Sequence, residues 1–96
     1  MRTNLALNLR RLVFFHHETA RDAARVIGVA EQTLSAWITG KREPATKQLF
    51  RIAELYEVDP SKLNGDPLIF AEILGNPTRI KLAEENLRRA QLKAVE

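Results

Sequence analysis

The sequence of 96 residues contains no cysteine, which excludes disulfide bridges and thiolate metal sites and is typical of a protein in a reducing compartment. It also has no run of about 18–20 apolar residues, the length that a transmembrane helix needs. The apolar stretch that starts at Leu5 is interrupted by Asn8, Arg10 and Arg11, unlike that of a signal peptide. These absences predict a cytoplasmic protein without a membrane partner.

Glycine and proline are scarce, with four of each, and they fall where the helical spacing of apolar residues starts or stops. No segment has the alternating pattern of a convincing strand. The sequence therefore predicts an all-α protein of about seven helices, over residues 4–16, 20–27, 31–39, 46–56, 60–63, 68–74 and 78–95.

Charge is unevenly distributed along the chain. The segment 1–65 holds ten Lys and Arg against seven Asp and Glu, whereas 66–96 holds five of each, so the whole excess of +3 lies in the first segment. A basic excess confined to one part of a chain is typical of phosphate-binding surfaces.

The most informative stretch is 19–44, where two short helical patterns meet at a glycine. Ala24 precedes Gly28 by four residues, and Leu34 and Trp37 follow it by six and nine. A small residue permits close helix approach, the glycine permits a positive φ, and the two apolar residues point inward. This spacing is what a helix-turn-helix requires to hold its two helices at a fixed angle.

Over roughly Leu5–Leu63 the sequence resembles the Cro/C1-type helix-turn-helix family of phage repressors, bacterial regulators and antitoxins. The matching elements are Leu9-Arg10-Arg11-Leu12, Ala24, Gly28-Val29, Thr33-Leu34-Ser35, Trp37, Gly40 to Pro44 and Leu49 to Ala53. The resemblance implies a five-helix, lambda repressor-like domain at 1–65 that is followed by a helical C-terminal extension at 66–96.

The resemblance also implies a recognition helix at 31–38 and two sets of DNA contacts. The base-contacting residues would be Glu31, Gln32, Thr33 and Ala36. The phosphate-contacting residues would be Arg10, Thr19, Ala20, Ser35, Lys41, Arg42, Thr46 and Lys47. The residue types suit these roles, because glutamine pairs with adenine, glutamate accepts from cytosine, and methyl groups pack on thymine. Glu31 has a second interpretation, as a carboxylate that only stabilises the helix N-terminus.

Four positions depart from the family pattern, in three ways. Ala20 stands where the family usually has a phosphate-bridging glutamine, and Ala30 stands where a serine or threonine usually caps the recognition helix. Val13 and Ile38 replace an Arg–Glu pair found in many members. An apolar replacement of both partners preserves packing, whereas loss of one partner alone costs about 3–5 kcal/mol.

Other chemistries find little support. His16 and His17 point about 100° apart on a helix, which predicts surface or partly buried side chains rather than a metal site. Ser35 and Ser61 have no nearby base, and no glycine-rich phosphate loop is present. We therefore expect no enzymatic activity, no cofactor, no metal and no small-molecule substrate.

The extension has two possible arrangements. In the first, the apolar helix 68–74 and an apolar seam within 78–95 pair with a second copy to form a homodimer through 66–96; the seam consists of Ile80, Ala83, Leu87, Ala90 and Ala94. In the second, the extension folds back on its own chain, and basic residues on it add a second DNA contact; these are Arg79, Lys81, Arg88 and Arg89. We expect the homodimer, because single helix-turn-helix units bind weakly.

The predicted function is a sequence-specific repressor or regulator of phage or bacterial type that binds a double-stranded DNA operator. A second hypothesis is an antitoxin-like interaction module, which the apolar segments 68–70 and 73–74 favour. A third is a DNA-packaging protein without sequence preference.

Overall fold

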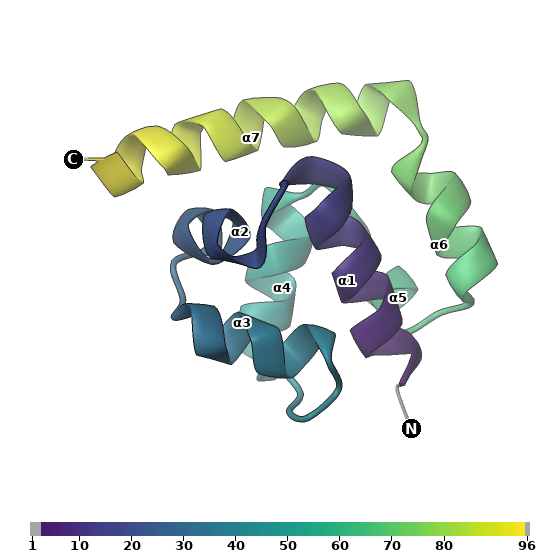
Figure 1. Cartoon of the computed structure of the whole chain (residues 1–96). Coiled ribbons are helices and arrows are strands. Elements are labelled where there is room, and N and C mark those ends of the chain that lie inside the picture. Colours follow the sequence, from purple (N-terminus) through teal and green to yellow (C-terminus); the bar gives the residue numbers. More distant parts are fainter. Residues whose placement is uncertain (1–2, 96) are drawn as a thin grey trace.

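The structure, a computed structural model, describes the backbone of residues 3–95 and the side chains of residues 3–92. Over this range the chain forms seven helices and no strand, which confirms the predicted all-α fold (Figure 1). The helices are α1 (Asn4–His16), α2 (Ala20–Ile27), α3 (Glu31–Ile38), α4 (Thr46–Leu55), α5 (Pro60–Leu63), α6 (Pro67–Leu74) and α7 (Pro77–Val95). Helices α3 and α4 end one residue before the predicted position, because Thr39 and Tyr56 are their C-caps.

Local sequence signals set the ends of α2. The Thr19 hydroxyl accepts a hydrogen bond from the Asp22 amide at 3.1 Å, which caps the N-terminus. At the other end Gly28 has a φ of +89°, and the amide of Val29 donates back to the Ala24 carbonyl at 3.0 Å. A glycine in the left-handed conformation, followed by a hydrogen bond from residue 29 back to residue 24, ends α2 and turns the chain sharply into α3. The turn predicted from the spacing is confirmed.

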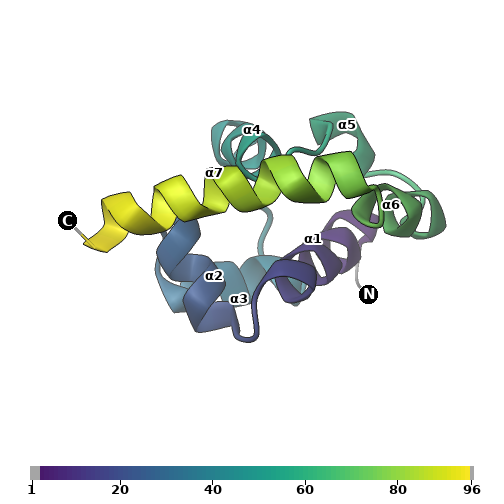
Figure 2. The same ribbon diagram turned by 90° about the horizontal axis from the view of Figure 1, so that it is seen from above.

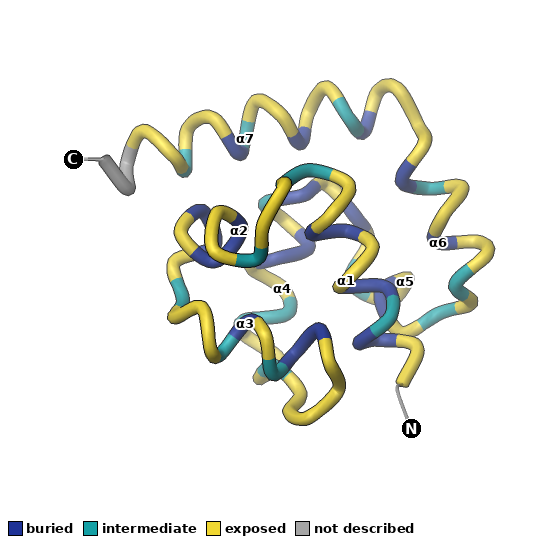
Figure 3. The backbone as a smooth tube through the Cα atoms, in the orientation of Figure 1, coloured by how far each residue is buried: buried dark blue, intermediate teal, exposed yellow. Residues whose placement is uncertain are grey.

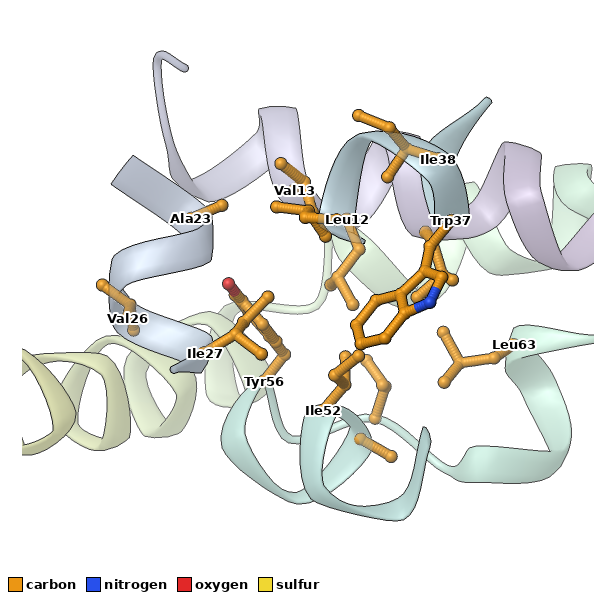
Figure 4. Close-up of a cluster of buried hydrophobic side chains, with 14 of the residues drawn as sticks. Leu12, Val13, Ala23, Val26, Ile27, Trp37, Ile38, Ile52, Tyr56 and Leu63 are labelled. Carbon is orange, nitrogen blue, oxygen red and sulfur yellow. The ribbon is translucent and has the colours of Figure 1, made fainter. Parts of the chain in front are cut away.

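The core cluster contains buried apolar side chains from all seven helices. Figure 4 shows the part of it that lies between α1, α2, α3, α4 and α5. Leu34 is fully buried, and Trp37 points its ring into the cluster near Ile52 and Leu63. Buried Asn8 ties α1 to the end of α5, since its amide donates to the carbonyls of Leu63 at 2.8 Å and Gly65 at 3.1 Å. The packing of Leu34 and Trp37 in this core sets the orientation of α3, so the opposite face of the helix points toward solvent.

The extension folds back on its own chain. Helix α6 packs against α1, and α7 crosses α2 and contacts α4 (Figure 2). Along α7, Ala83 and Leu87 are buried and Ile80 and Ala90 are half-buried. Figure 3 shows that the buried positions of α7 lie on the side that faces the other helices. The predicted seam is thus covered by the chain itself, apart from Ala94, whose side chain lies outside the described residues. The expectation that this seam pairs with a second copy does not agree with its packing.

Arg79 anchors the extension. Its guanidinium donates to the carbonyls of Tyr56, Ile73 and Leu74 at 2.9, 3.1 and 2.8 Å. These carbonyls stand at the C-terminal ends of α4 and α6, where the helix dipole favours a cation. Because only 6% of Arg79 is exposed, the prediction that it adds a DNA contact is wrong.

Candidate nucleic-acid interface

Helix α3 presents one face to solvent and lies on the opposite side of the domain from α7 (Figure 1). Leu34, Trp37 and Ile38 are buried, whereas Glu31 and Gln32 are exposed. With 3.6 residues per turn, Gln32 and Ala36 lie nearly opposite the centre of the buried stripe. Gln32 is therefore the long polar side chain that projects farthest from the core, and Ala36 leaves room beside it.

A shallow hollow of about 410 Å³ accompanies this face. It is lined by Glu31, Gln32, Ser35, Ala36 and Lys41. The structure thus brings together three of the four predicted base-contacting residues and two of the predicted phosphate-contacting ones. Thr33, the fourth, is half-buried and lies at the edge of the face rather than in the hollow.

The loop after α3 holds two exposed cations close to the end of that helix. Gly40 has a φ of +81°, and the amides of Lys41 and Arg42 both donate to the Ala36 carbonyl, at 2.9 and 3.1 Å. The Thr39 hydroxyl also donates to the Ser35 carbonyl at 2.7 Å. These bonds fix the loop backbone while leaving both basic side chains exposed.

The N-terminus of α4 follows this loop and carries exposed Thr46 and Lys47. Ala45, the N-cap, has no side-chain acceptor, but its amide donates to Gln48 Oε1 at 3.1 Å. This is half of a capping box, and it leaves the other first-turn amides without a side-chain partner. The residues predicted to contact phosphates therefore lie both in the loop after α3 and in the first turn of α4.

The remaining predicted contacts lie on α1 and at the start of α2. Arg10 is exposed but does not line the hollow, and neighbouring Arg11 donates to the Pro67 carbonyl of α6 at 3.0 Å. The Thr19 hydroxyl caps α2, and Ala20 is half-buried in its first turn. At Thr19 and Ala20 a phosphate would therefore be bound by backbone amides at the N-terminus of α2 rather than by the side chains.

The three departures from the family pattern have distinct consequences. Ala20 supplies no side-chain hydrogen bond, and Ala30 leaves α3 without a side-chain cap. Val13 and Ile38 are 1% and 6% exposed and belong to one core cluster. The predicted apolar replacement of an ion pair is therefore part of the packing between α1 and α3.

The two adjacent histidines, His16 and His17, form hydrogen bonds with partly or fully buried side chains. His17 Nε2 lies 2.8 Å from the Tyr56 hydroxyl, and His16 Nε2 lies 3.2 Å from Nη1 of Arg79. Burial, with the Arg79 cation as the second cause, lowers the pKa of His16 to about 4, and burial also lowers that of His17. Both side chains are half-buried, as predicted. Among the described residues, no group of three or more His, Cys, Asp or Glu is placed to hold a metal ion.

Sequence reasoning missed the contacts that dock α7. Besides Arg79, Asn86 of α7 donates to the Glu54 carbonyl at 3.2 Å and to Glu57 Oε1 at 2.9 Å. Glu57 has a φ of +54° just after the C-cap of α4, a conformation that usually selects glycine or asparagine. A polar residue on a polar helix carries no local sign of such a role, so no sequence signal identified these residues.

The comparisons with known proteins agree with this geometry. The family model described as Helix-turn-helix matches residues 19–63, from the N-cap of α2 to the end of α5. No curated protein and no solved structure matches the chain significantly. In the part of the chain that the structure describes, every helix is too short or too polar to cross a membrane.

Proposed function

We propose that this chain, of which residues 19–63 match the family model described as Helix-turn-helix, is a DNA-binding regulator of the Cro/C1 type that acts as a sequence-specific repressor of phage or bacterial type. It would insert α3 into the major groove of an operator and exclude polymerase from the site. The observation that carries the proposal is the exposed α3 face with Gln32 beside the basic loop. A regulator of this kind works in the cytoplasm, without a cofactor or catalytic step.

The proposed contacts fall into two classes. Glu31, Gln32, Thr33 and Ala36 would read base edges. Arg10, Thr19, Ala20, Ser35, Lys41, Arg42, Thr46 and Lys47 would bind phosphates. Gln32 is the best candidate for a bidentate contact with adenine, because it is exposed and lines the hollow. Thr33 lies at the edge of the face, so its contact would be apolar and peripheral.

Selection of bound sites from a random DNA pool tests the proposal. We expect one enriched sequence, and on it Gln32→Ala should lose about 1–3 kcal/mol while relaxing the preference at a single base pair. Equal affinity for selected and random DNA at physiological salt would instead identify a packaging protein. An equal loss on specific and random DNA for Gln32→Ala would show that the helix is oriented differently.

Lys41→Gln is the variant to compare with Gln32→Ala, because we assign Lys41 to a phosphate contact and Gln32 to a base contact. Its affinity should fall by a similar factor on every sequence, and the slope of log K against log salt should become less steep by about one. A change in base preference would contradict the assignment of Lys41 to a phosphate.

We also propose a homodimer through 66–96, formed by the exposed side of α6, since the other part of the predicted dimer surface, the seam on α7, is covered by the chain itself. On α6, Leu68 is 75% and Ile69 51% exposed, although this helix is rich in apolar residues. Two half-sites about 34 Å apart would hold the two copies together, so a small apolar contact would suffice on DNA. Sedimentation with and without the selected duplex tests this: Leu68→Glu should leave only single-copy complexes.

The antitoxin-like alternative has less support than the sequence indicated. Of its apolar segments, Phe70 and Leu74 are buried and Ile73 is half-buried, so these side chains pack within the chain. Leu68 and Ile69 are the large apolar side chains of these segments that remain exposed. Co-purification of a small partner protein from the native host that requires Leu68 and Ile69 would favour this alternative.

A further inference from the structure

The groove between α2, α4 and α7 lies away from the α3 face and has no part in the proposed DNA contacts. Its volume is about 690 Å³, within the range of small-molecule sites. Figure 2 shows α7 crossing over α2, with α4 on the other side of α7. The groove is lined by Arg25, Val26, Gly28, Arg51, Glu54, Leu55, Glu57, Asn86, Arg89 and Ala90.

Three arginines reach this groove from three different helices: Arg25 from α2, Arg51 from α4 and Arg89 from α7. Arg25 lies in the last turn of α2, where a cation stabilises the helix terminus. That role needs one charge, whereas this groove gathers three exposed guanidinium groups, whose mutual repulsion a bound anion would lower. Planar guanidinium groups bind carboxylates and phosphates through paired hydrogen bonds.

The carboxylates in the groove do not remove this excess. Glu57 already accepts a hydrogen bond from Asn86, and Glu54 is the second of only two acidic side chains in the lining. Three cations thus face two anions, which leaves one positive charge in excess. Glu54 is left as an acceptor for a hydroxyl or amino group of a ligand.

Apolar side chains complete the groove. Val26 is buried, and Leu55 and Ala90 are half-buried, so the groove combines an apolar wall with charged groups. Arg51 also lies directly against the turn between α2 and α3, because a Cβ added to Gly28 would be 3.3 Å from its Nη2. A ligand bound to Arg51 would therefore lie close to the turn between α2 and α3.

We propose that this groove binds a small organic anion, one that carries a phosphate or carboxylate group and at least one hydrogen-bond donor. The anionic group would lie between Arg25, Arg51 and Arg89, its apolar part against Val26 and Ala90, and its donor on Glu54. This site is separate from the α3 face and does not depend on DNA binding.

The test uses the full chain without DNA and two probes, pyrophosphate and citrate, added separately in constant ionic strength. Nitrogen–proton spectra follow the Gly28 amide and the side-chain Nε–H groups of Arg25, Arg51 and Arg89. We expect saturable shifts of these four signals with one dissociation constant for at least one probe. Saturation by pyrophosphate alone assigns a phosphate ligand, and saturation by citrate alone assigns a carboxylate ligand.

Two triple variants with equal charge loss separate the groove from general anion attraction. Replacing Arg25, Arg51 and Arg89 by glutamine should weaken probe binding at least tenfold. The matched control, with glutamine at Arg10, Lys41 and Arg42, should bind the probes as the wild type does. Should the first variant fail to fold, Arg89→Gln alone serves, since Arg89 is exposed on α7. Shifts that rise linearly with both probes, or an equal loss in the control, would overturn the proposal.

Discussion

At the scale of single residues, Gly28 determines how α2 joins α3. Its φ of +89° lies in the region that strains L side chains, and an added Cβ would come within 3.3 Å of Arg51 Nη2. Gly75 offers a matched contrast, because its φ of −81° is helical and the nearest atom to an added Cβ is 3.6 Å away. The two glycines therefore differ in conformation and surroundings.

Gly28→Ala should accordingly lower the free energy of unfolding by about 1–2 kcal/mol. Gly75→Ala should leave it unchanged or raise it by about 0.4–1 kcal/mol, since a restricted unfolded chain favours folding. Urea unfolding followed by circular dichroism measures both. Equal effects of the two substitutions would contradict the strained turn.

His16 makes stability depend on pH through a single side chain. Its pKa in the folded chain is lowered to about 4 from the usual 6.5, mainly by burial and then by the Arg79 cation. Between these two values the unfolded chain binds the proton and the folded chain does not. The stability present above pH 6.5 is therefore lost progressively as the pH falls toward 4.

We expect wild-type unfolding free energy to fall between pH 7 and pH 5 by about 1 kcal/mol more than that of His16→Gln, after allowing for the half-exposed position of the ring. Glutamine keeps an acceptor for Arg79 but does not titrate. Carboxylates titrate equally in both proteins, so the difference between them isolates His16. Parallel pH profiles would show that His16 binds its proton in the folded chain as readily as in water.

At the scale of elements, α7 depends on Arg79 for its position. Its guanidinium is bonded to three carbonyls at the ends of α4 and α6, with His16 as a further partner and the ring of Phe15 5.5 Å away. A neutral side chain there leaves those carbonyls without donors in a buried site, which costs more than the loss of an exposed charge.

Arg79→Met should therefore destabilise the chain by about 2–4 kcal/mol. Arg88→Met, which removes an exposed charge from the same helix, should change stability by less than about 0.5 kcal/mol. Thermal unfolding of both variants provides the comparison. A small effect at Arg79 would mean that α7 is held by its apolar face alone.

Helices and their order follow closely from local signals, whereas the docking of α7 does not. Thr19 and Asp59 cap the N-termini of α2 and α5, and Gly28 ends α2, so each acts within a few residues of its own position. Val26 is buried because α7 covers it, a contact between segments some 60 positions apart that no periodicity in α2 reveals. The seam on α7 indicated an apolar partner but not which surface would be that partner.

For the candidate site too, the sequence predicted the features that depend on local spacing but not those that depend on contacts in the folded chain. The face of α3 follows from the spacing of Leu34 and Trp37, since burying these two side chains exposes Gln32. The positions of Lys41 and Arg42 depend on backbone bonds to Ala36, which a loop sequence does not encode visibly. Arg79 was misjudged because a charged residue on a polar helix is usually exposed.

At the scale of the whole molecule, we propose that 1–65 is the DNA-binding domain and that 66–96 supports it. Phe70, Leu74 and Leu87 of the extension belong to the same core cluster as the first five helices. A chain that ends at residue 65 would expose apolar surface on α1, α2 and α4 that these residues now cover.

Truncation after residue 65 should lower the melting temperature by more than 10 °C or abolish cooperative unfolding, because the remaining domain is near the lower size limit for independent folding. Differential scanning calorimetry of both chains measures this. An unchanged melting temperature would mean that the extension contributes no stability to the domain.

The most direct test of the central claim, that the exposed face of α3 reads DNA, is the map of amide chemical shifts on titration with the selected duplex. We expect the largest shifts at 31–36, with further shifts at 19–20 and 41–47, and none along the exposed face of α7. Large shifts on α7 with an unperturbed 31–36 segment would contradict it.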